Sequence, residues 1–405
     1  MMNNDKRLRD VRILEAQTLL SPEAMAESYP ATEKAAETVL RGRDEVQRIL
    51  RREDDRFLVV VGPCSIHDPE SALDYAKRLA ELRVKYQDRM CIVMRVYFEK
   101  PRTTVGWRGL IVDPGLDGTS DIGRGLKMAR ELLIAVNGLG LPAGSEMLDP
   151  IVPQYTSDLV SWASIGARTT ESQTHREMAS GLSMPVGFKN ATDGDVQIAV
   201  NAIVSSRQAH AFIGITREGK ASIMRTLGNP DSHLILRGGK HGTNYDRESV
   251  SQAIVLLKKA GIRPSIVVDC SHGNSQKMPE NQIGVLLETI RLRNDADNPL
   301  LPLCGCMIES YLQTGSQPIT ADPSDLKYGL SITDPCLGWD MTASALAEAY
   351  KLLGEKHHSE SAPEEVSSAN IVTIPKRTDK GDHPAAKDAD GKAALDCAGK
   401  ASGSR

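Results

Sequence analysis

An unbroken apolar run rich in β-branched valine, Phe57–Gly62, ends abruptly at Pro63. A continuous run of this kind is typical of a strand buried on both faces, as in parallel sheets. Proline lacks the N–H that a sheet ladder needs, so pairing is predicted to end there. Cys64 is therefore expected at the carboxyl end of a buried strand, where α/β proteins place their chemistry. A structural cysteine is the simpler interpretation; later strands that also end in reactive or cationic residues favour a functional one.

Length and composition limit the class of protein. The chain of 405 residues has room for two or three average domains, or for one large barrel with extensions. Its net charge of −4 gives no reason to expect nucleic acid or a membrane as partner. The first residues lack the apolar core of a signal peptide, and no apolar run reaches transmembrane length, so we expect a cytoplasmic protein. Cys304 and Cys306 alternate at strand period and are expected to pack on one face.

Strand and helix patterns alternate from Phe57 onward. Strands are predicted at residues 57–64, 91–98, 142–148, 161–168, 185–190, 210–216, 221–226, 233–238, 265–271 and 303–309. Helices are predicted at 69–88, 124–139, 154–160, 174–182, 194–207, 247–261, 280–293 and 341–353.

Two of the ten predicted strands, 210–216 and 221–226, are separated by only four residues. Parallel neighbours need a crossover of a dozen or more residues, so these two form an antiparallel hairpin. The eight strands that remain alternate with helices over roughly 300 residues, which predicts a (β/α)8 TIM barrel. A doubly wound open sheet is the alternative, and no Gly-x-Gly-x-x-Gly turn after the first strand supports it.

The chain is thus divided into three parts. Residues 1–56 are predicted to be an N-terminal extension that makes oligomer or regulatory contacts. It holds a short edge strand at 11–15 and an amphipathic helix at 32–53 whose apolar face packs on the main body or on another subunit. The catalytic barrel is predicted at 57–353 with the hairpin inserted at 211–226. The lack of apolar periodicity predicts a disordered tail at 354–405.

A first set of residues near the predicted strand ends combines a thiol, an imidazole and two carboxylates. Such a donor set suits one borderline divalent ion: Mn, Fe, Co or Zn. Its members are Cys64, His272, Glu309 and Asp334. They come from four separate segments, so the prediction of a metal site depends on the barrel to bring them together.

A second set at the same ends is cationic: Arg95, Lys100, Arg102, Arg168, Lys189 and Arg237. Most cations lie on a solvated surface, but these flank apolar strands, and a desolvated cation without a partner is costly. Six cations around one mouth predict an anionic ligand, most simply phosphates and carboxylates held by arginine.

Six stretches together resemble the type I 3-deoxy-D-arabino-heptulosonate 7-phosphate (DAHP) synthases. They are Gly62-Pro-Cys-Ser-Ile-His-Asp68, residues 94–107 with Glu99-Lys-Pro-Arg-Thr-Thr104, Gly166-Ala-Arg-Thr-Thr-Glu-Ser-Gln173, Gly187-Phe-Lys-Asn190, Leu236-Arg-Gly-Gly-Lys240 and Ser331-Ile-Thr-Asp334. The resemblance extends from about residue 10 to 353.

The resemblance implies a metal-dependent condensation of phosphoenolpyruvate with erythrose 4-phosphate, the entry step of the shikimate pathway. It implies that Cys64, His272, Glu309 and Asp334 bind the metal, and that Arg95, Arg168, Lys189 and Arg237 bind phosphoenolpyruvate. Lys100, Pro101, Arg102 and Thr103 would then bind the aldose phosphate. Lys100, Glu146 and His272 would be the catalytic residues.

The same resemblance implies a homo-oligomer, dimer or tetramer, and an aromatic amino acid inhibitor bound between the hairpin and a neighbouring subunit. Gly214 leaves space for a larger effector, tyrosine rather than phenylalanine; loss of regulation is the alternative. Two other functions stay open. One is the sibling synthase of 3-deoxy-octulosonate 8-phosphate, against which the segment Lys100–Thr104 argues. The other is a non-catalytic barrel that senses an aromatic amino acid.

Overall fold

The computed structural model describes residues 8–355. The predicted tail therefore lies outside the described residues, apart from Gly354 and Glu355. The strands are β1 (Phe57–Gly62), β2 (Met90–Arg95), β3 (Ala143–Glu146), β4 (Trp162–Ile165), β5 (Val186–Lys189), β6 (Ala211–Ile215), β7 (Ala221–Arg225), β8 (His233–Leu236), β9 (Ile266–Asp269) and β10 (Leu303–Glu309).

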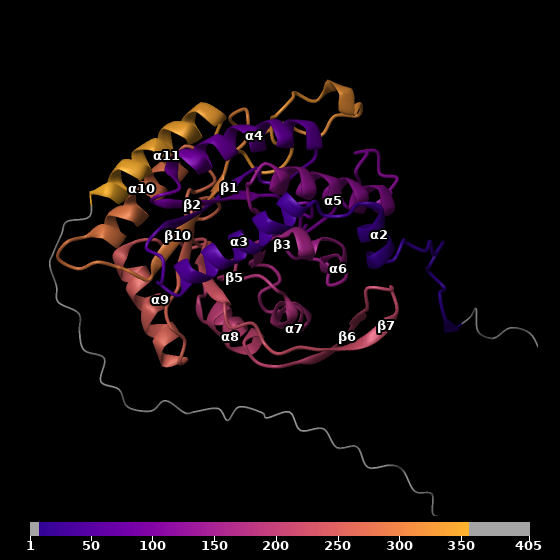
Figure 1. Cartoon of the computed structure of the whole chain (residues 1–405), viewed down its shortest axis with the longest axis horizontal. Helices are drawn as coiled ribbons and strands as arrows, with labels where there is room; N and C mark the ends of the chain where they lie inside the picture. The colour runs from indigo at the N-terminus through magenta and orange to yellow at the C-terminus, as the bar shows by residue number, and fades with distance from the viewer. Residues whose placement is uncertain (1–7, 356–405) are drawn as a thin grey trace, which may run out of the picture. The chain divides into compact units, whose positions relative to one another are not determined.

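Helices precede the first strand, fill most connections between the barrel strands and follow the last strand, as Figure 1 shows. They are α2 (Pro22–Ser28), α3 (Glu33–Leu50), α4 (Pro69–Tyr86), α5 (Ile122–Gly138), α6 (Pro153–Thr156), α7 (Gln173–Gly181), α8 (Gln197–Ser206), α9 (Arg247–Lys259), α10 (Asn281–Asn294) and α11 (Trp339–Gly354), with the 3-10 turns η1 (Ser157–Leu159) and η2 (Pro323–Asp325). No helix among residues 8–355 is long and apolar enough to cross a membrane.

Eight parallel strands close into a barrel in the order β1-β10-β9-β8-β5-β4-β3-β2. Closure is achieved because β1 pairs with β2 on one side and with β10 on the other. An open sheet would leave β1 or another strand with a free edge, so the doubly wound alternative is wrong. The (β/α)8 barrel predicted from the alternating pattern is confirmed, and its carboxyl ends form one mouth.

The strands β6 and β7 form a separate antiparallel hairpin with Ile213 opposite Ile223. Figure 1 shows the hairpin outside the barrel, beyond α7. Its turn is tied to the N-terminal extension, because the Glu23 N–H donates to the Arg217 carbonyl at 2.8 Å. The antiparallel hairpin predicted from its four-residue turn is therefore present.

Helix α3 covers the amino-terminal end of the barrel. Its apolar residues Val46, Ile49 and Leu50 are buried with the interior of the barrel. Arg51, just after the helix, pairs with Asp231 at 2.8 Å. Most of the apolar face of this helix is thus covered by the main body, although Leu40 is 65% exposed. The edge strand predicted at 11–15 is wrong, because these residues pair with no strand in the described chain.

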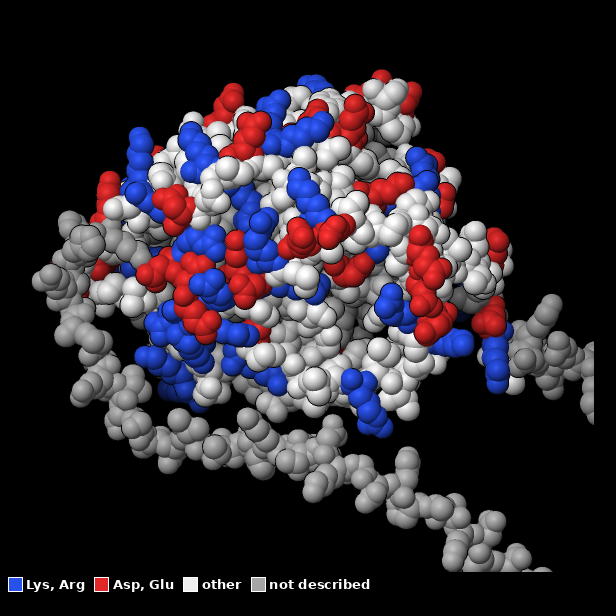
Figure 2. Space-filling model, viewed as in Figure 1, with Lys and Arg blue, Asp and Glu red and all other residues white. Residues whose placement is uncertain are grey.

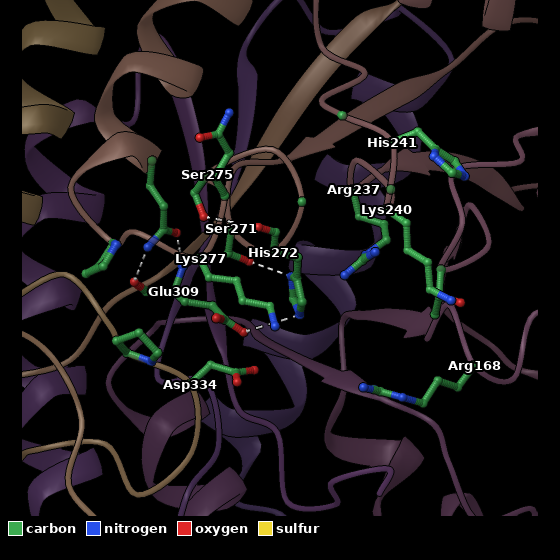
Figure 3. Close-up of a pocket in the computed structure, with 18 residues that line it drawn as sticks. Arg168, Arg237, Lys240, His241, Ser271, His272, Ser275, Lys277, Glu309 and Asp334 are labelled. Carbon is green, nitrogen blue, oxygen red and sulfur yellow. Dashed lines mark hydrogen bonds and ion pairs between the residues drawn. The ribbon is translucent and has the colours of Figure 1, made fainter. Parts of the chain in front are cut away.

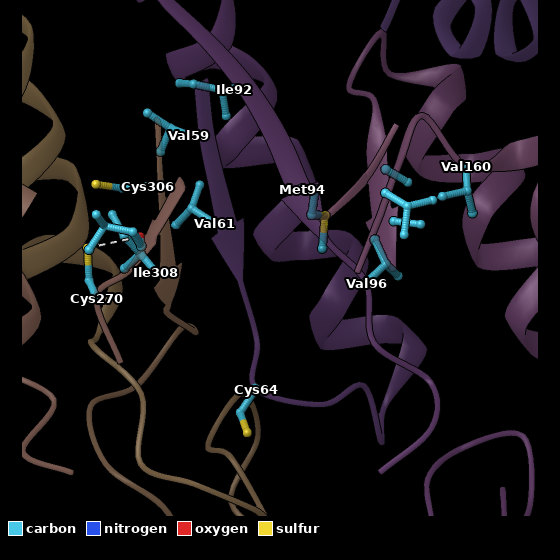
Figure 4. Close-up of a cluster of buried hydrophobic side chains, with 14 of the residues drawn as sticks. Val59, Val61, Cys64, Ile92, Met94, Val96, Val160, Cys270, Cys306 and Ile308 are labelled. Carbon is cyan, nitrogen blue, oxygen red and sulfur yellow. Dashed lines mark hydrogen bonds between the residues drawn. The ribbon is translucent and has the colours of Figure 1, made fainter. Parts of the chain in front are cut away.

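The largest apolar cluster packs between the outer surface of the barrel and the helices, and it includes Val59, Val61 and Ile308. Figure 4 shows Cys64 apart from these side chains, beyond the end of β1. Cys304 and Cys306 do not share a face: Cys304 packs in the interior cluster and Cys306 in the outer one. A register shift between Leu303 and Gly305 separates them, because a bulge interrupts the alternation of side chains.

Candidate active site

A cavity of about 750 Å³ opens at the carboxyl ends of the strands. Its lining includes Arg168, Arg237, His272, Glu309 and Asp334. Figure 3 shows Arg168 and Arg237 on one side of the cavity, Glu309 and Asp334 on the other, and His272 between them. The barrel thus brings members of both predicted sets to one place.

The predicted metal ligands lie close together. One ligand atom each of Cys64, Glu309 and Asp334 falls within 4.8 Å of the others. His272 Nε2 lies 4.0 Å from Glu309 Oε1, so the imidazole borders the same group. A thiol, an imidazole and two carboxylates in this arrangement fit a borderline divalent ion.

The ammonium group of Lys100 borders the donor set. Lys100 Nζ lies 2.7 Å from Cys64 Sγ and 3.6 Å from Asp334 Oδ2. Burial raises the pKa of the Cys64 thiol to about 11, and Glu309 adds to the rise. Burial lowers the pKa of Lys100, but Cys64, Glu309 and Asp334 more than offset this effect. The pKa of Lys100 therefore lies above the usual value. The position where these donors meet therefore favours a positively charged group. A metal site requires such a position.

Asp269, the last residue of β9, holds two site residues in place. It accepts a hydrogen bond from Lys189 Nζ at 2.7 Å and lies 3.0 Å from His272 Nδ1. Burial opposes the charge of Asp269, but Lys189 and His272 hold its pKa well below the usual range. Because Nδ1 faces this carboxylate, Nε2 is the nitrogen left for the donor set. Sequence reasoning missed Asp269.

Arg95 is almost completely buried at the end of β2. Its Nη2 donates to Glu309 Oε1 at 2.9 Å, and its guanidinium lies 3.5 Å from the centre of the Tyr97 ring. Nη1 has no hydrogen-bond partner among the described residues. A buried donor without a partner is costly, so this nitrogen fits a bound acceptor group.

Two buried or half-buried asparagines fix the turn that carries Arg237. The Arg237 N–H donates to Asn190 Oδ1 at 2.8 Å, and the Gly238 N–H donates to Asn244 Oδ1 at 2.7 Å. Gly238 is required here, because its φ is +72° and a Cβ would lie 2.6 Å from the Asn274 nitrogen. Sequence reasoning missed both asparagines: the partner of Asn190 lies in a distant segment, and that of Asn244 lies within the same turn.

The predicted aldose-phosphate residues lie on the loop after β2. Arg102 Nε donates to the carbonyl of Trp107 in the same loop at 2.8 Å, and Arg102 and Thr103 are exposed while Pro101 is half-buried. Of the four predicted residues on this loop, only Lys100 is joined to the donor set by a contact within residues 8–355.

Two buried carboxyl groups lie beside this loop. Glu146 ends β3, and its Oε1 has no hydrogen-bond partner among the described residues. Burial raises the pKa of Glu99 to about 7, with Asp149 and Glu146 adding to the rise. The unpaired oxygen of Glu146 is free to accept a proton or a hydrogen bond from a ligand.

A second cavity of about 350 Å³ lies beneath the hairpin. Its lining includes Ser180, Phe212, Gly214, Met224 and Thr226. A Cβ at position 214 would lie 2.7 Å from Met224 Cγ, so the flexible side chain of Met224 fills part of the space beside the glycine.

The fold and the mouth together define the class of this protein: a (β/α)8-barrel enzyme with its site at the carboxyl ends of the strands. Comparison with known proteins gives the family. The model described as the DAHP synthetase I family matches residues 29–347.

Relatives agree over most of the chain. The Tyr-sensitive phospho-2-dehydro-3-deoxyheptonate aldolase of Escherichia coli (strain K12) is 48% identical over 344 residues, which cover 85% of this chain and 96% of that protein. The Phe-sensitive enzyme of the same strain is 49% identical over 339 residues, covering 84% and 95%. A solved phospho-2-dehydro-3-deoxyheptonate aldolase from Francisella tularensis SCHU S4 superposes with a TM-score of 0.82 at 44% identity, covering 85% of this chain and 100% of that one.

The chain therefore belongs to the DAHP synthetase I family and is a transferase of the 3-deoxy-7-phosphoheptulonate synthase class.

Proposed function

We propose that the enzyme condenses phosphoenolpyruvate with erythrose 4-phosphate to give 3-deoxy-D-arabino-heptulosonate 7-phosphate and phosphate, the first step of the shikimate pathway. One observation carries the proposal: cations and a metal-type donor set meet in one cavity at the barrel mouth. The two substrates are anionic, so the cations match their charge. Membership of the family supports the same reaction.

Phosphoenolpyruvate is assigned to the cation side of the cavity. Arg168 and Arg237 line that side, and burial lowers the pKa of Arg237, so its charge gains from an anionic partner. Arg95 offers its unpaired Nη1, and Lys189 offers a buried ammonium held by Asp269. These four cations are the proposed binding site for the phosphate and carboxylate of this substrate. Pro101, Arg102 and Thr103, with Lys100, are the proposed site for the aldose phosphate.

The reaction forms one C–C bond, adds the oxygen of water at C2 and breaks the C2–O bond to phosphate. The enol carbon C3 attacks the aldehyde carbon, and the aldehyde oxygen takes a proton that we assign to Lys100 because its ammonium stands at the donor set. Water then adds at C2 and gives up a proton, which we assign to Glu146 because its Oε1 is unpaired. The second proton of the added water passes to the leaving phosphate, the C2 carbonyl forms as the C2–O bond to the phosphoryl group breaks, and the charge of inorganic phosphate is balanced by Arg168 and Arg237.

One divalent metal ion, Mn, Fe, Co or Zn, is proposed as cofactor. Cys64, His272, Glu309 and Asp334 would hold it, with His272 oriented by Asp269. The ion would supply Lewis-acid polarisation of the aldehyde.

The experiment is phosphate release from phosphoenolpyruvate with and without erythrose 4-phosphate, in metal-loaded and chelator-treated enzyme. The proposal expects release that needs both the aldose phosphate and the metal. Release with a five-carbon aldose phosphate instead would identify the octulosonate sibling. If neither aldose phosphate gives phosphate release, the proposed reaction is contradicted, and a non-catalytic barrel that senses an aromatic amino acid is favoured.

An aromatic amino acid is the proposed inhibitor, bound in the cavity under the hairpin. Relatives named Tyr-sensitive, Phe-sensitive and Trp-sensitive support an inhibitor of this kind. We assign tyrosine because Gly214 carries no side chain and its neighbour Met224 is flexible.

A homo-oligomer, dimer or tetramer, is also proposed. Ile213 and Ile223, which face each other on the hairpin, are 87% and 69% exposed, and Leu14 of the extension is 101% exposed. The exposure of these three large apolar side chains favours a surface that another subunit covers. Sedimentation of the purified protein at several concentrations tests this; a monomer throughout would contradict it.

A further inference from the structure

Gln282, in the first turn of α10, makes two hydrogen bonds to the backbone of one residue, Glu309. The Glu309 N–H donates to Gln282 Oε1 at 2.8 Å, and Gln282 Nε2 donates to the Glu309 carbonyl at 3.1 Å. Gln282 is 1% exposed, so both bonds are shielded from water. A carboxamide can serve both groups because it holds one donor and one acceptor side by side.

These bonds lie on the side of β10 where β9 no longer pairs, next to Leu337, which makes a short parallel bridge with Ser310. β9 pairs with β10 as far as Asp269 opposite Met307, and the Cys270 N–H still donates to the Met307 carbonyl at 2.9 Å. Beyond that point the chain turns away and places His272, with φ +56°, at the mouth. Glu309 lies two residues after Met307, so its N–H and carbonyl face the side that β9 has left. The carbonyl has a second partner there, because the Leu337 N–H donates to it at 3.0 Å. The N–H has Gln282 as its partner, and without Gln282 it would face that gap.

The other side of the strand end is paired as usual. Gly62 of β1 is the register partner of Glu309, and the Ser310 N–H donates to the Gly62 carbonyl at 2.9 Å. The Glu309 carboxylate points into the mouth, where Arg95 Nη2 donates to it at 2.9 Å. The backbone of Glu309 is therefore held by β1 on one side and by Gln282 and Leu337 on the other, and this placement directs its carboxylate into the mouth.

We propose that Gln282 is a positioning residue that sets the place of the Glu309 carboxylate in the metal donor set. The inference rests on the proposed metal-dependent function. Partners that orient a metal ligand commonly contribute 10–100-fold to metal affinity. Gln282 acts through the backbone of Glu309 rather than through the Glu309 side chain. No sequence motif identifies it.

The experiment measures the Co²⁺ dissociation constant of the full-length protein by titration, in the absence of substrate. Gln282→Leu removes both bonds, and Gln282→Glu keeps the shape but removes the donor. Both variants are expected to bind Co²⁺ about 10–100-fold more weakly than wild type. The Cys64 thiolate-to-Co²⁺ absorption band should still appear at saturating metal, because Cys64 is on β1's side of the site and is not moved. Gln252→Glu, the same change at an exposed position of α9, is the matched control and should bind as wild type does.

A double-mutant cycle separates positioning from general destabilisation. In a Glu309→Gln background, which lacks the carboxylate to be positioned, Gln282→Leu should change the Co²⁺ affinity by less than about twofold. Weakening that persists in this background overturns the inference, as does wild-type affinity in both folded Gln282 variants. If Gln282→Leu does not fold, Gln282→Glu gives the same comparison. A wild-type protein that binds no Co²⁺ overturns the proposed function itself, which distinguishes that failure from this one.

Discussion

The ammonium group of Lys189 lies 2.7 Å from the carboxylate of Asp269, and the two side chains are only 5% and 1% exposed. The pair spans β8, which lies between β5 and β9 in the barrel. Asp269 also borders His272 Nδ1 at 3.0 Å. One buried carboxylate thus joins the proposed substrate-binding cation to a proposed metal ligand.

The first prediction concerns this pair. Lys189→Met leaves Asp269 charged and buried without its cation, which should lower the free energy of unfolding by about 3–5 kcal/mol. Adding Asp269→Asn removes the stranded charge and should restore much of that loss. Urea titration of the single and double variants measures both values. Equal stability of the two variants would contradict the prediction.

The same substitution separates the two sets of residues. Lys189→Met should bind phosphoenolpyruvate at least tenfold more weakly, because it removes a cation of the proposed substrate site. It should bind the metal within a few-fold of wild type, because Asp269 still faces His272. Titrations with each ligand measure this. Joint loss of metal and substrate binding would show that Lys189 serves both sites.

The second prediction uses Gly166, just after β4. A Cβ at this position would collide with Glu146 Oε1, so Gly166→Ala displaces the carboxylate without removing it. Misplacement of a reacting group by about 1 Å can cost about 100-fold in rate. The kcat should fall on that scale while phosphoenolpyruvate and metal affinities stay near wild type. Gly284→Ala, in α10 with nothing within 4 Å of its added methyl group, is the control that should keep full activity. A wild-type kcat for Gly166→Ala would remove Glu146 from the proposed mechanism.

The sequence predicts the barrel well because the barrel follows from local patterns. Apolar runs that end in charged or reactive residues mark the strands, and connection length alone separates the hairpin from the parallel strands. This pattern predicts Lys189 as a site residue. Asp269 ends an apolar strand in the same way and could have been found by it.

Other features could not be predicted because their partners are far away in sequence. Gln282 and Asn190 contact backbone groups that only the closed barrel brings near. The separate faces of Cys304 and Cys306 depend on a register shift between β9 and β10, and an alternating pattern in one strand cannot show such a shift.

The third prediction concerns the cavity under the hairpin. Gly214→Ala adds a methyl group that would lie 2.7 Å from Met224 Cγ and 3.5 Å from the Phe212 ring, so the cavity narrows. Tyrosine should then inhibit at least tenfold more weakly, while activity without effector is unchanged. Ala221→Ser, at an exposed position of β7, is the control that should keep wild-type inhibition. Unchanged inhibition by tyrosine in Gly214→Ala would place the effector elsewhere.

The fourth prediction concerns acid stability and His233, the first residue of β8, which is 2% exposed. Trp162 Nε1 donates to His233 Nε2 at 3.1 Å, and an indole nitrogen can only donate. Nε2 must therefore be the acceptor, and Nδ1 carries the proton toward the Asp231 carbonyl at 3.1 Å. The imidazole is neutral in the folded protein.

The pKa of His233 is lowered to about 4: burial is the largest cause and the charge of Arg207 adds to it, while the hydrogen bond to the Asp231 carbonyl opposes both. The unfolded chain has the ordinary pKa of about 6.5, so it binds the proton more tightly than the folded protein does. His233 therefore contributes full stability above pH 6.5, and this contribution is lost as the pH falls from 6.5 toward 4.

Between pH 7.5 and pH 5 the loss from this one group should be about 2 kcal/mol. Urea titrations of wild type and His233→Gln at both pH values measure it, because the other titrating groups are common to the two proteins and cancel in the difference. Wild type should lose about 2 kcal/mol more than His233→Gln between the two pH values. If both proteins lose the same amount, His233 does not stay neutral in the folded state, and the assignment of Nε2 as the acceptor for Trp162 is contradicted.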